Sequence, residues 1–259
     1  SVESFLQFAE EHGLLTQLSF ADLAIKTKLH TFDAQKEKRG SWPILKCLTA
    51  EFKLKGKTYI LDEGALFSVD RDYLSSLNSF IASIQKFGLD LPKTTAGEEE
   101  GPYNIRLASK LRHALLLDKK LVRRLQASAI EICDVVLKDR RLIHVKRGLS
   151  SSSLSHLFAQ GVVSAELLHM DQGFRHGVRG VLNGTLSGSG ASTRSNFQWL
   201  YASPFETSRC EVTYVIMTGK AAGLKSTELP FFSKVNLRQR CLELTRMGFE
   251  YSLSLVPAA

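Results

Sequence analysis

The spacing of apolar residues predicts two short helices at the start of the chain, over residues 1–12 and 19–29. From residue 44 to 69 apolar positions alternate with polar ones and are interrupted by turn residues, a pattern typical of strands. This part of the chain is therefore expected to form a small antiparallel meander. Asp70 follows the meander and can cap a helix that continues to about residue 87.

The second half of the chain alternates between helical and strand-like spacing. Residues 88–102 contain two prolines and three consecutive glutamates, and we expect a boundary there between domains at residues 1–92 and 98–259. This order of elements predicts an α/β or α+β fold, a mixed β-sheet flanked by helices. The predicted elements after the boundary are helix 103–113, strand 115–117, a strand hairpin over 129–147, helix 154–170, a flexible loop at 184–195, strand 211–217, helix 233–247 and strand 249–255.

The hairpin over residues 129–147 carries the residues best suited to chemistry. Asp134 lies in its first β-branched run, and His144 and Lys146 lie in its second. Because successive side chains of a strand alternate between faces, a turn of odd length brings Asp134 opposite the other two. A turn of even length brings Glu131 there instead, so both carboxylates stay candidates.

Asp134, His144 and Lys146 are the candidate catalytic residues. A carboxylate-bound Mg²⁺ or Mn²⁺ activates water for phosphodiester hydrolysis, and a nearby lysine neutralises charge in the transition state. The candidate metal ligands are Asp134, Glu131 and Glu100, the last at the start of a predicted helix. His144 has three open roles, as a metal ligand, a general base or the remnant of an inactive site. The plainer interpretation is a hairpin whose polar residues face solvent.

The positive charge of the chain is concentrated around this hairpin. The net charge is +8 at pH 7, and residues 105–150 hold twelve Lys or Arg and four acidic residues, which accounts for the whole excess. Such a concentration is typical of proteins that bind a polyanion. The four serines at 150–153 precede a predicted helix and form a natural phosphate-binding turn. The expected nucleic-acid contacts, with DNA favoured over RNA, are Arg140, Arg141, Arg147, Ser152, Ser153, His156 and Gln160.

Several other classes of protein find no support in the sequence. No apolar run approaches the ~18 residues of a membrane-spanning helix, and no signal peptide is recognisable. The four cysteines form no C-x-x-C pair, which argues against a zinc site or a disulfide framework and favours a cytoplasmic protein. No glycine-rich nucleotide loop and no G-x-S-x-G motif occurs. The chain begins with Ser1 rather than Met, so we expect a fragment or a processed form.

Parts of the chain resemble a sporadically distributed bacterial family of unknown function. The residues that carry the resemblance are Glu131-Ile-Cys-Asp-Val-Val-Leu, Leu142-Ile-His-Val-Lys-Arg, the helix after the serine turn from Ser153 to Leu167, and Leu229-Pro-Phe-Phe-Ser-Lys-Val-Asn-Leu-Arg, together with the segments Trp42–Ile60 and Glu100–Asn104. Members of that family occur beside restriction and other phage-defence genes and are longer than this chain. The resemblance implies a role in phage defence and brings no established activity.

A more distant resemblance, over residues 98–217, is to the restriction-endonuclease-like nucleases. It rests on the order of a helix with a glutamate, a strand, a strand with Asp134, a strand with His144-x-Lys146 and a helix with Gln160. The resemblance implies a restriction-endonuclease-like core. The chain departs from that pattern at His144, where those nucleases carry Glu or Asp.

Together these features favour a nucleic-acid-binding defence protein that is a metal-dependent nuclease. Two other functions stay open. One is a non-catalytic nucleic-acid-binding or sensor module on the same scaffold, and the other is an interaction subunit that docks through its N-terminal meander, as a homo-oligomer or within a defence complex.

Overall fold

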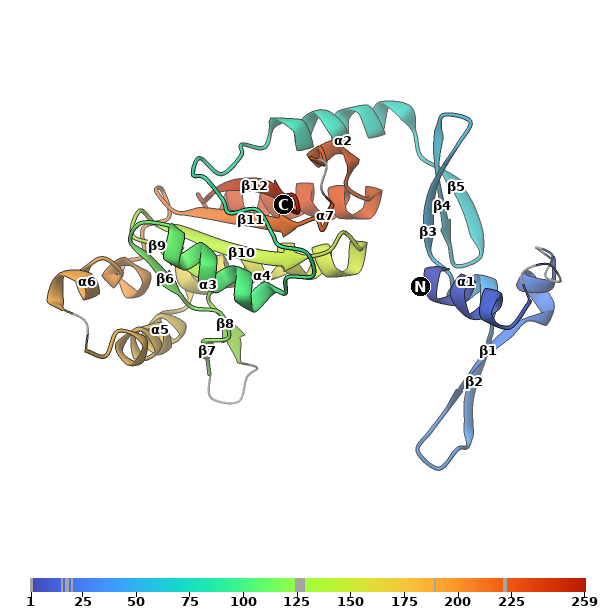
Figure 1. The fold of residues 1–259 in the computed structure, drawn as a ribbon, viewed down its shortest axis with the longest axis horizontal. Helices are drawn as coiled ribbons and strands as arrows, with labels where there is room; N and C mark the ends of the chain where they lie inside the picture. Colours follow the sequence, from blue (N-terminus) through green and yellow to red (C-terminus); the bar gives the residue numbers. More distant parts are fainter. Residues whose placement is uncertain are drawn as a thin grey trace. The chain divides into compact units, whose positions relative to one another are not determined.

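The computed structural model describes residues 2–259 except 15, 17, 18, 20, 124–128, 189, 221 and 222. The chain forms two compact units, Ser1–Ser76 and Leu77–Ala259 (Figure 1). The division falls inside helix α2 (Arg71–Ser83), earlier than the expected segment 88–102. The physical reason is that Leu77 and Ile81 of α2 are fully buried, and most of Phe87 is buried too. The chain from Leu77 onwards therefore packs as part of the second unit.

The first unit contains two small antiparallel sheets. The expected meander is present as β3-β4-β5, and a hairpin of β1 and β2 precedes it. That hairpin was not predicted, because every residue of β1 is exposed and no alternation of apolar and polar positions marks it. The elements are α1 (Val2–Glu11), η1 (Asp22–Lys26), β1 (Lys28–Phe32), β2 (Lys38–Pro43), η2 (Ile44–Cys47), β3 (Ala50–Leu54), β4 (Lys57–Asp62) and β5 (Ala65–Ser68).

The second unit is built on a five-stranded mixed sheet of order β12-β11-β10-β9-β6. Strands β6, β9 and β10 are antiparallel neighbours, whereas β10, β11 and β12 run parallel. The predicted mixed sheet flanked by helices is therefore confirmed. The further elements are α3 (Glu100–Lys110), β6 (Ala114–Leu116), β7 (Leu121–Val122), β8 (Ile130–Glu131), β9 (Val135–Leu137), β10 (Arg141–Arg147), α4 (Ser151–Met170), α5 (Gln172–Thr185), α6 (Ala191–Ser195), η3 (Gln198–Tyr201), β11 (Glu211–Met217), η4 (Ser226–Glu228), α7 (Phe231–Arg246) and β12 (Glu250–Val256).

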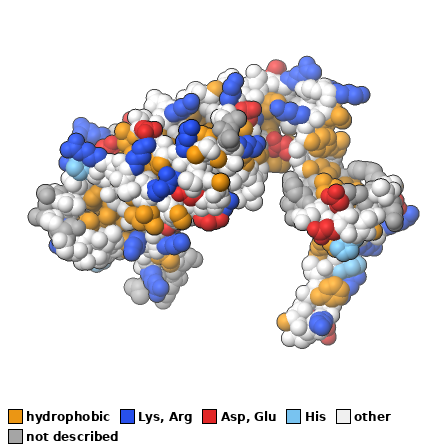
Figure 2. All heavy atoms as spheres, viewed as in Figure 1, with side chains coloured by type: hydrophobic (Ala, Val, Ile, Leu, Met, Phe, Trp, Pro, Cys, Tyr) orange, Lys and Arg blue, Asp and Glu red, His pale blue; other side chains and the backbone are white. Residues whose placement is uncertain are grey.

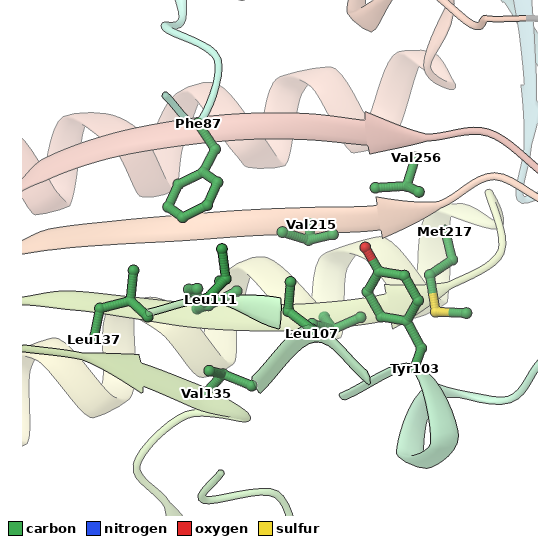
Figure 3. Packing of buried hydrophobic residues seen from close by; sticks show 11 residues of the cluster. Phe87, Tyr103, Leu107, Leu111, Val135, Leu137, Val215, Met217 and Val256 are labelled. Atoms are coloured by element: carbon green, nitrogen blue, oxygen red, sulfur yellow. The ribbon is translucent and has the colours of Figure 1, made fainter. Parts of the chain in front are cut away.

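Helix α3 covers one face of this sheet and α4 covers the other (Figure 1). On the α3 face, Tyr103 and Leu107 pack against buried residues of β9, β10, β11 and β12 in one apolar cluster (Figure 3). On the α4 face, the ring of Phe158 meets that of Tyr214 edge-on, with the centroids 5.2 Å apart. Since both faces are buried, the central strands read as continuous apolar runs rather than alternating ones.

Three helical segments differ from the sequence-based expectation. The helix expected over residues 19–29 is reduced to the five-residue segment η1, because β1 begins at Lys28. Helix α5 was not predicted, and α6 lies within the stretch 184–195 that was expected to be a flexible loop. Helix α5 contains four glycines, residues that weaken the helical signal, and it is stabilised by a cap: Asp171 Oδ1 accepts from the N–H of Phe174 at 2.8 Å.

Candidate metal centre

Asp134 lies immediately before β9 and beside the second half of β10. The turn between the two strands has three residues, the odd length that places position 134 opposite His144. The regular strand register ends at Val135, although the N–H of Asp134 still donates to the carbonyl of Ile143 at 3.0 Å. Beyond this point the side chain of Asp134, rather than a strand backbone, bonds to β10. The Oδ2 of Asp134 accepts a hydrogen bond from the N–H of Val145 at 2.7 Å. Asp134 is therefore anchored at the edge of β10 rather than projecting from a regular strand.

Two more carboxylates converge on Asp134. Asp118 comes from the turn after β6, and Glu131 ends β8. One oxygen of each of Asp118, Glu131 and Asp134 lies within 4.8 Å of the others, and all three side chains are half-buried. The N–H of Lys119 donates to Glu131 and fixes its orientation. This carboxylate cluster could hold a metal ion, and its ligand atoms are all oxygen.

Burial and neighbouring charges make the ionisation of Asp134 and Glu131 unfavourable. Burial raises the pKa of Asp134 well above its usual range, and the nearby charges of Glu131 and Asp118 raise it further, against the lowering effect of the Val145 N–H. Burial also raises the pKa of Glu131, with smaller contributions from Asp118 and from Glu100. A bound cation would relieve this repulsion, which is the electrostatic condition of a metal site.

Asn104 of α3 supports the carboxylate cluster from the helix side. Its side chain is fully buried, and its Nδ2 donates to Asp134 Oδ1 at 3.1 Å. The amide oxygen of Asn104 has no hydrogen-bond partner among the described residues. A buried polar atom without a partner is costly, so its presence beside the three carboxylates is consistent with a polar ligand at this position.

Glu100, in the first turn of α3, lies beside the cluster but is held by other partners. Its carboxylate accepts from Lys146 Nζ at 3.0 and 3.1 Å and from the N–H of Arg147 at 2.9 Å. Its charge nevertheless contributes to the raised pKa of Glu131. Glu100 and Lys146 thus form an ion pair at the border of the cluster, where the sequence had placed a metal ligand and a catalytic cation.

The structure does not bring His144 into this site. The imidazole points into the α4 face, where its Nε2 is 3.4 Å from Ser164 Oγ and its ring centroid is 6.3 Å from that of Tyr214. Only 3% of the residue is exposed, and burial lowers its pKa to about 4. The expected convergence of Asp134, His144 and Lys146 is therefore corrected: the Asp134 carboxylate turns to the strand edge, while the His144 ring follows strand alternation into the core.

The three arginines expected to contact nucleic acid are engaged within the protein. Arg140 pairs with Glu206 at 2.9 Å, and Arg147 pairs with Glu99. The guanidinium of Arg141 lies 3.3 Å from Asp139, 3.5 Å from Glu211 and 5.1 Å from the centre of the Phe87 ring. These contacts stabilise the ends of β10 and leave the three side chains less available to phosphates than the sequence suggested.

The serine turn acts as a helix cap. The hydroxyl of Ser150 accepts from the N–H of Ser153 at 3.3 Å, and it donates to the Ser153 hydroxyl at 2.8 Å. Of the other residues expected to contact nucleic acid, Ser152 and His156 are exposed on α4, and Gln160 is half-buried. The structure therefore places these groups on one helix.

The basic segment is largely neutralised by acidic residues outside it. Six of its cations form ion pairs, and all of them except Arg141 pair only with acids that lie outside residues 105–150. On the face drawn in Figure 2, Lys and Arg side chains are spread over the second unit rather than joined in one patch. Within the described part of the segment, which excludes Arg124, the cations without an ion pair are Arg112, Lys119, Lys120, Arg123 and Lys138. Three of these, Lys119, Lys120 and Arg123, follow Asp118 closely along the chain.

Two residues of the site were not predicted from the sequence. From the sequence, Asp118 was counted only as a charge. Its place in Asp-Lys-Lys, directly after an apolar strand, is the signal that could have marked it as a candidate ligand. Asn104 was not predicted as a site residue, because an asparagine at the start of a predicted helix has no periodicity that would mark it as buried and polar.

The whole chain matches a known protein family. The model of DUF6119, a family of unknown function, covers residues 1–257. The chain belongs to the DUF6119 family. No curated protein and no solved structure matches it significantly. Among the helices that the structure describes, none has both the length and the apolar character needed to cross a bilayer.

Proposed function

We propose that this DUF6119 protein is a metal-dependent phosphodiesterase that acts on nucleic acid, with DNA as the favoured substrate. The observation that carries the proposal is the carboxylate cluster of Asp118, Glu131 and Asp134, whose oxygens lie within 4.8 Å of one another beside a lysine ion pair. An all-oxygen set suits Mg²⁺ or Mn²⁺, and the absence of His144 from the set removes the reason to favour a softer ion.

The residues of the site have separable roles in this proposal. A bound ion would supply an activated water and offset charge on the phosphate. The carboxylates of the cluster hold the ion, with Asp134 positioned by Asn104 and Val145. Lys146 lies at the border of the site, where its ammonium is placed to neutralise developing negative charge. The unpaired cations Lys119, Lys120 and Arg123 provide contacts to the nucleic-acid backbone.

The topology of the second unit supports the same proposal. The succession α3, β6, β9, β10, α4 follows the order of helix, three strands and helix on which the resemblance to restriction-endonuclease-like nucleases rests. The cluster lies where Asp134 meets the second half of β10, which is also the position that the resemblance implies. The separate resemblance to a bacterial family that occurs beside defence genes extends the proposal to phage DNA as the substrate.

The decisive experiment is a cleavage assay combined with a metal-binding measurement. Purified protein is incubated with Mg²⁺ or Mn²⁺ and with linear DNA, circular DNA, single-stranded DNA and RNA, and Mn²⁺ binding is followed by titration calorimetry. Asp134→Asn and Glu131→Gln are expected to abolish both cleavage and Mn²⁺ binding. Glu166→Gln, a matched change at an exposed acid of α4, is expected to alter neither.

A second candidate is a non-catalytic nucleic-acid-binding module. It is favoured by the ion pair of Glu100 with Lys146, which occupies two groups that a nuclease would use, and by His144, which stands where related nucleases are expected to carry a second acid. The same assay separates the two functions. Salt-dependent DNA binding with no cleavage by any metal-loaded sample would replace the nuclease with the binding module.

A further inference from the structure

A second site is suggested by a cavity at the other end of the central sheet. The cavity has a volume of about 540 Å³ and opens where α3 leads into β6 and where β9 leads into β10. Along β9, residue 138 is four residues beyond Asp134, which corresponds to about 13 Å at the usual rise of a strand. The volume lies within the range of ~300–1,000 Å³ that small-molecule sites occupy.

The walls of this cavity are apolar. Leu111 and Leu137 form its inner side and belong to the buried core cluster. Leu89 lies at its edge, and 41% of this residue remains exposed. A ligand in the cavity would therefore bury apolar surface that the protein alone leaves in contact with water.

The rim of the cavity carries an excess of positive charge. Both of its acids are already paired, Asp90 with Lys110 at 2.6 Å and Asp139 with Arg141 at 3.3 Å. By contrast, the side chains of Arg112, His113 and Lys138 have no hydrogen bond or ion pair to any described residue, although all three line the cavity. Two cations without an ion pair, Arg112 and Lys138, thus lie at the mouth of an apolar cavity.

The backbone holds the residues of this rim side by side. The carbonyl of His113 accepts a hydrogen bond from the N–H of Lys138 at 3.1 Å, which joins the two ends of the rim. His113 adopts a positive φ of 57°, an uncommon conformation for a residue with a side chain. The resulting arrangement is fixed by the meeting of β6 and β9 rather than by contacts among the side chains.

We propose that this cavity binds a phosphorylated small molecule with an apolar or planar body, of the mononucleotide class. The body would lie against Leu89, Leu111 and Leu137, and the phosphate would be bound by Arg112 and Lys138. Arginine suits a phosphate because its planar group donates two parallel hydrogen bonds. The site goes beyond the proposed nuclease function, since none of its lining residues belongs to the carboxylate cluster.

The test is titration calorimetry on the full chain in EDTA, so that no divalent ion can bridge a nucleotide to the carboxylate cluster. The probes are AMP, ATP, adenosine and inorganic phosphate. We expect AMP or ATP to bind at one site per chain, and adenosine and inorganic phosphate each to bind at least about tenfold more weakly. The first comparison tests the need for the phosphate and the second tests the need for the apolar walls.

Variants locate the binding. Arg112→Gln combined with Lys138→Gln is expected to weaken nucleotide binding at least about tenfold. Arg209→Gln combined with Arg246→Gln removes the same charge from two exposed positions elsewhere in the second unit and is expected to leave affinity unchanged. Leu89→Glu places a negative charge on the exposed wall, where it does not disturb the core, and is expected to abolish binding.

Three results would overturn the proposal. The first is that none of the nucleotides binds. The second is that the Arg112 and Lys138 double variant binds as tightly as the wild type, and the third is that inorganic phosphate binds as well as AMP. Binding of oligonucleotides alone, with no binding of mononucleotides, would likewise exclude a small-molecule site.

Discussion

The Asp134 carboxylate is held against two other carboxylates at a place where little water reaches it. The stability of the folded state therefore differs strongly between the neutral and the charged form of this residue. The bond from Val145 N–H favours the charged form, but burial and the charges of Glu131 and Asp118 outweigh it. In the absence of a metal ion, the folded protein thus binds a proton at this cluster more tightly than the unfolded chain does.

This imbalance predicts how stability depends on pH. Since the folded protein binds more protons than the unfolded chain, metal-free protein should lose stability as the pH rises above the usual Asp value of ~3.9 towards the raised folded pKa. In EDTA, Tm measured by calorimetry should therefore fall between about pH 6.5 and 8. A constant or rising Tm over this interval would show that ionisation of the carboxylate cluster does not destabilise the folded protein.

Asp134→Asn should remove much of this strain. The amide keeps an oxygen for the Val145 N–H and carries no charge, so in EDTA at pH 8 the variant should be more stable than the wild type. A pKa raised by one pH unit corresponds to ~1.4 kcal/mol in the free energy of unfolding. For a domain of this size, that free energy is about 3–6 °C in Tm. Added Mn²⁺ should raise the Tm of the wild type and leave that of the variant unchanged. Glu166→Gln serves as the control.

The buried His144 should make stability depend on pH in the opposite direction below pH 7. Burial lowers the pKa of its imidazole to about 4, so the folded state holds the neutral form. Stability contributed by this neutral state should be lost as the pH falls from the usual ~6.5 towards 4. His144→Leu should abolish this loss at a cost of less than ~1.5 kcal/mol at pH 7, because Ser164 keeps its bond to the Gly161 carbonyl. The measurement is chemical denaturation at several pH values.

The substitution that would restore a nuclease-like acid at this position should fail for a structural reason. His144→Glu would bury a carboxylate on the α4 face without a cationic partner, which costs about 3–5 kcal/mol. We expect reduced solubility and a lower denaturation midpoint, and no gain in cleavage. A stable and more active His144→Glu variant would show instead that this side chain reaches the carboxylate cluster.

Among the helices and strands of the second unit, α4 approaches β11 closely. Gly161 of α4 faces Tyr214 of β11, and a Cβ at position 161 would lie 2.6 Å from both Cε1 and Oη of that ring. Tyr214 is itself fixed, since it is fully buried and its hydroxyl donates to the Phe158 carbonyl at 3.0 Å. The absence of a side chain at position 161 therefore sets the distance between helix and sheet.

Gly161→Ala should destabilise the protein by about 1–3 kcal/mol, because the ring has no free space into which it can move. The matched control is Gly180→Ala on α5, where a Cβ would meet nothing within 4 Å. That change should be neutral or stabilising by up to ~1 kcal/mol through helix propensity. Urea denaturation of both variants checks the prediction, and equal midpoints would contradict it.

Over the molecule as a whole, the net charge of +8 overstates the surface available to a polyanion. Acids from other segments pair with six cations of residues 105–150. Among the described residues of that segment, the cations without an ion pair are Lys119, Lys120 and Arg123, which follow Asp118 of the carboxylate cluster, and Arg112 and Lys138 at the other end of β9. The position of unpaired charge, rather than its total, is expected to govern nucleic-acid affinity.

The salt dependence of DNA binding tests this expectation. Replacing Lys119, Lys120 and Arg123 together by Gln should reduce the slope of log affinity against log salt by ~0.9 for each phosphate that the protein no longer neutralises. Replacing Lys86, Arg209 and Arg246 by Gln removes the same charge from other exposed positions and should change the slope much less. Equal slopes for the two triple variants, measured by fluorescence anisotropy, would exclude a phosphate track beside the cluster.

The amino-acid pattern was enough to predict the elements of the sheet and two of the three carboxylates. Periodicity is a local property, so the runs of β9 to β12, the meander, and helices α2, α4 and α7 could be predicted from neighbouring residues. Asp134 and Glu131 were predicted as ligands because their positions on the hairpin limited them to two faces. The odd turn between β9 and β10 was one of the two alternatives that this reasoning left open.

Which groups meet could be learned only from the folded chain. Asp118 reaches the site from the turn after β6 and Asn104 from α3, and no local pattern specifies either approach. The place where β9 stops pairing turns Asp134 to the strand edge, while burial under α4 takes His144 out of the site. Likewise, Arg140 and Arg147 pair with distant acids, which removes charge that the sequence alone had assigned to a polyanion. The reason is that convergence depends on long-range strand pairing and helix packing, whereas the residue pattern records only what each segment must bury.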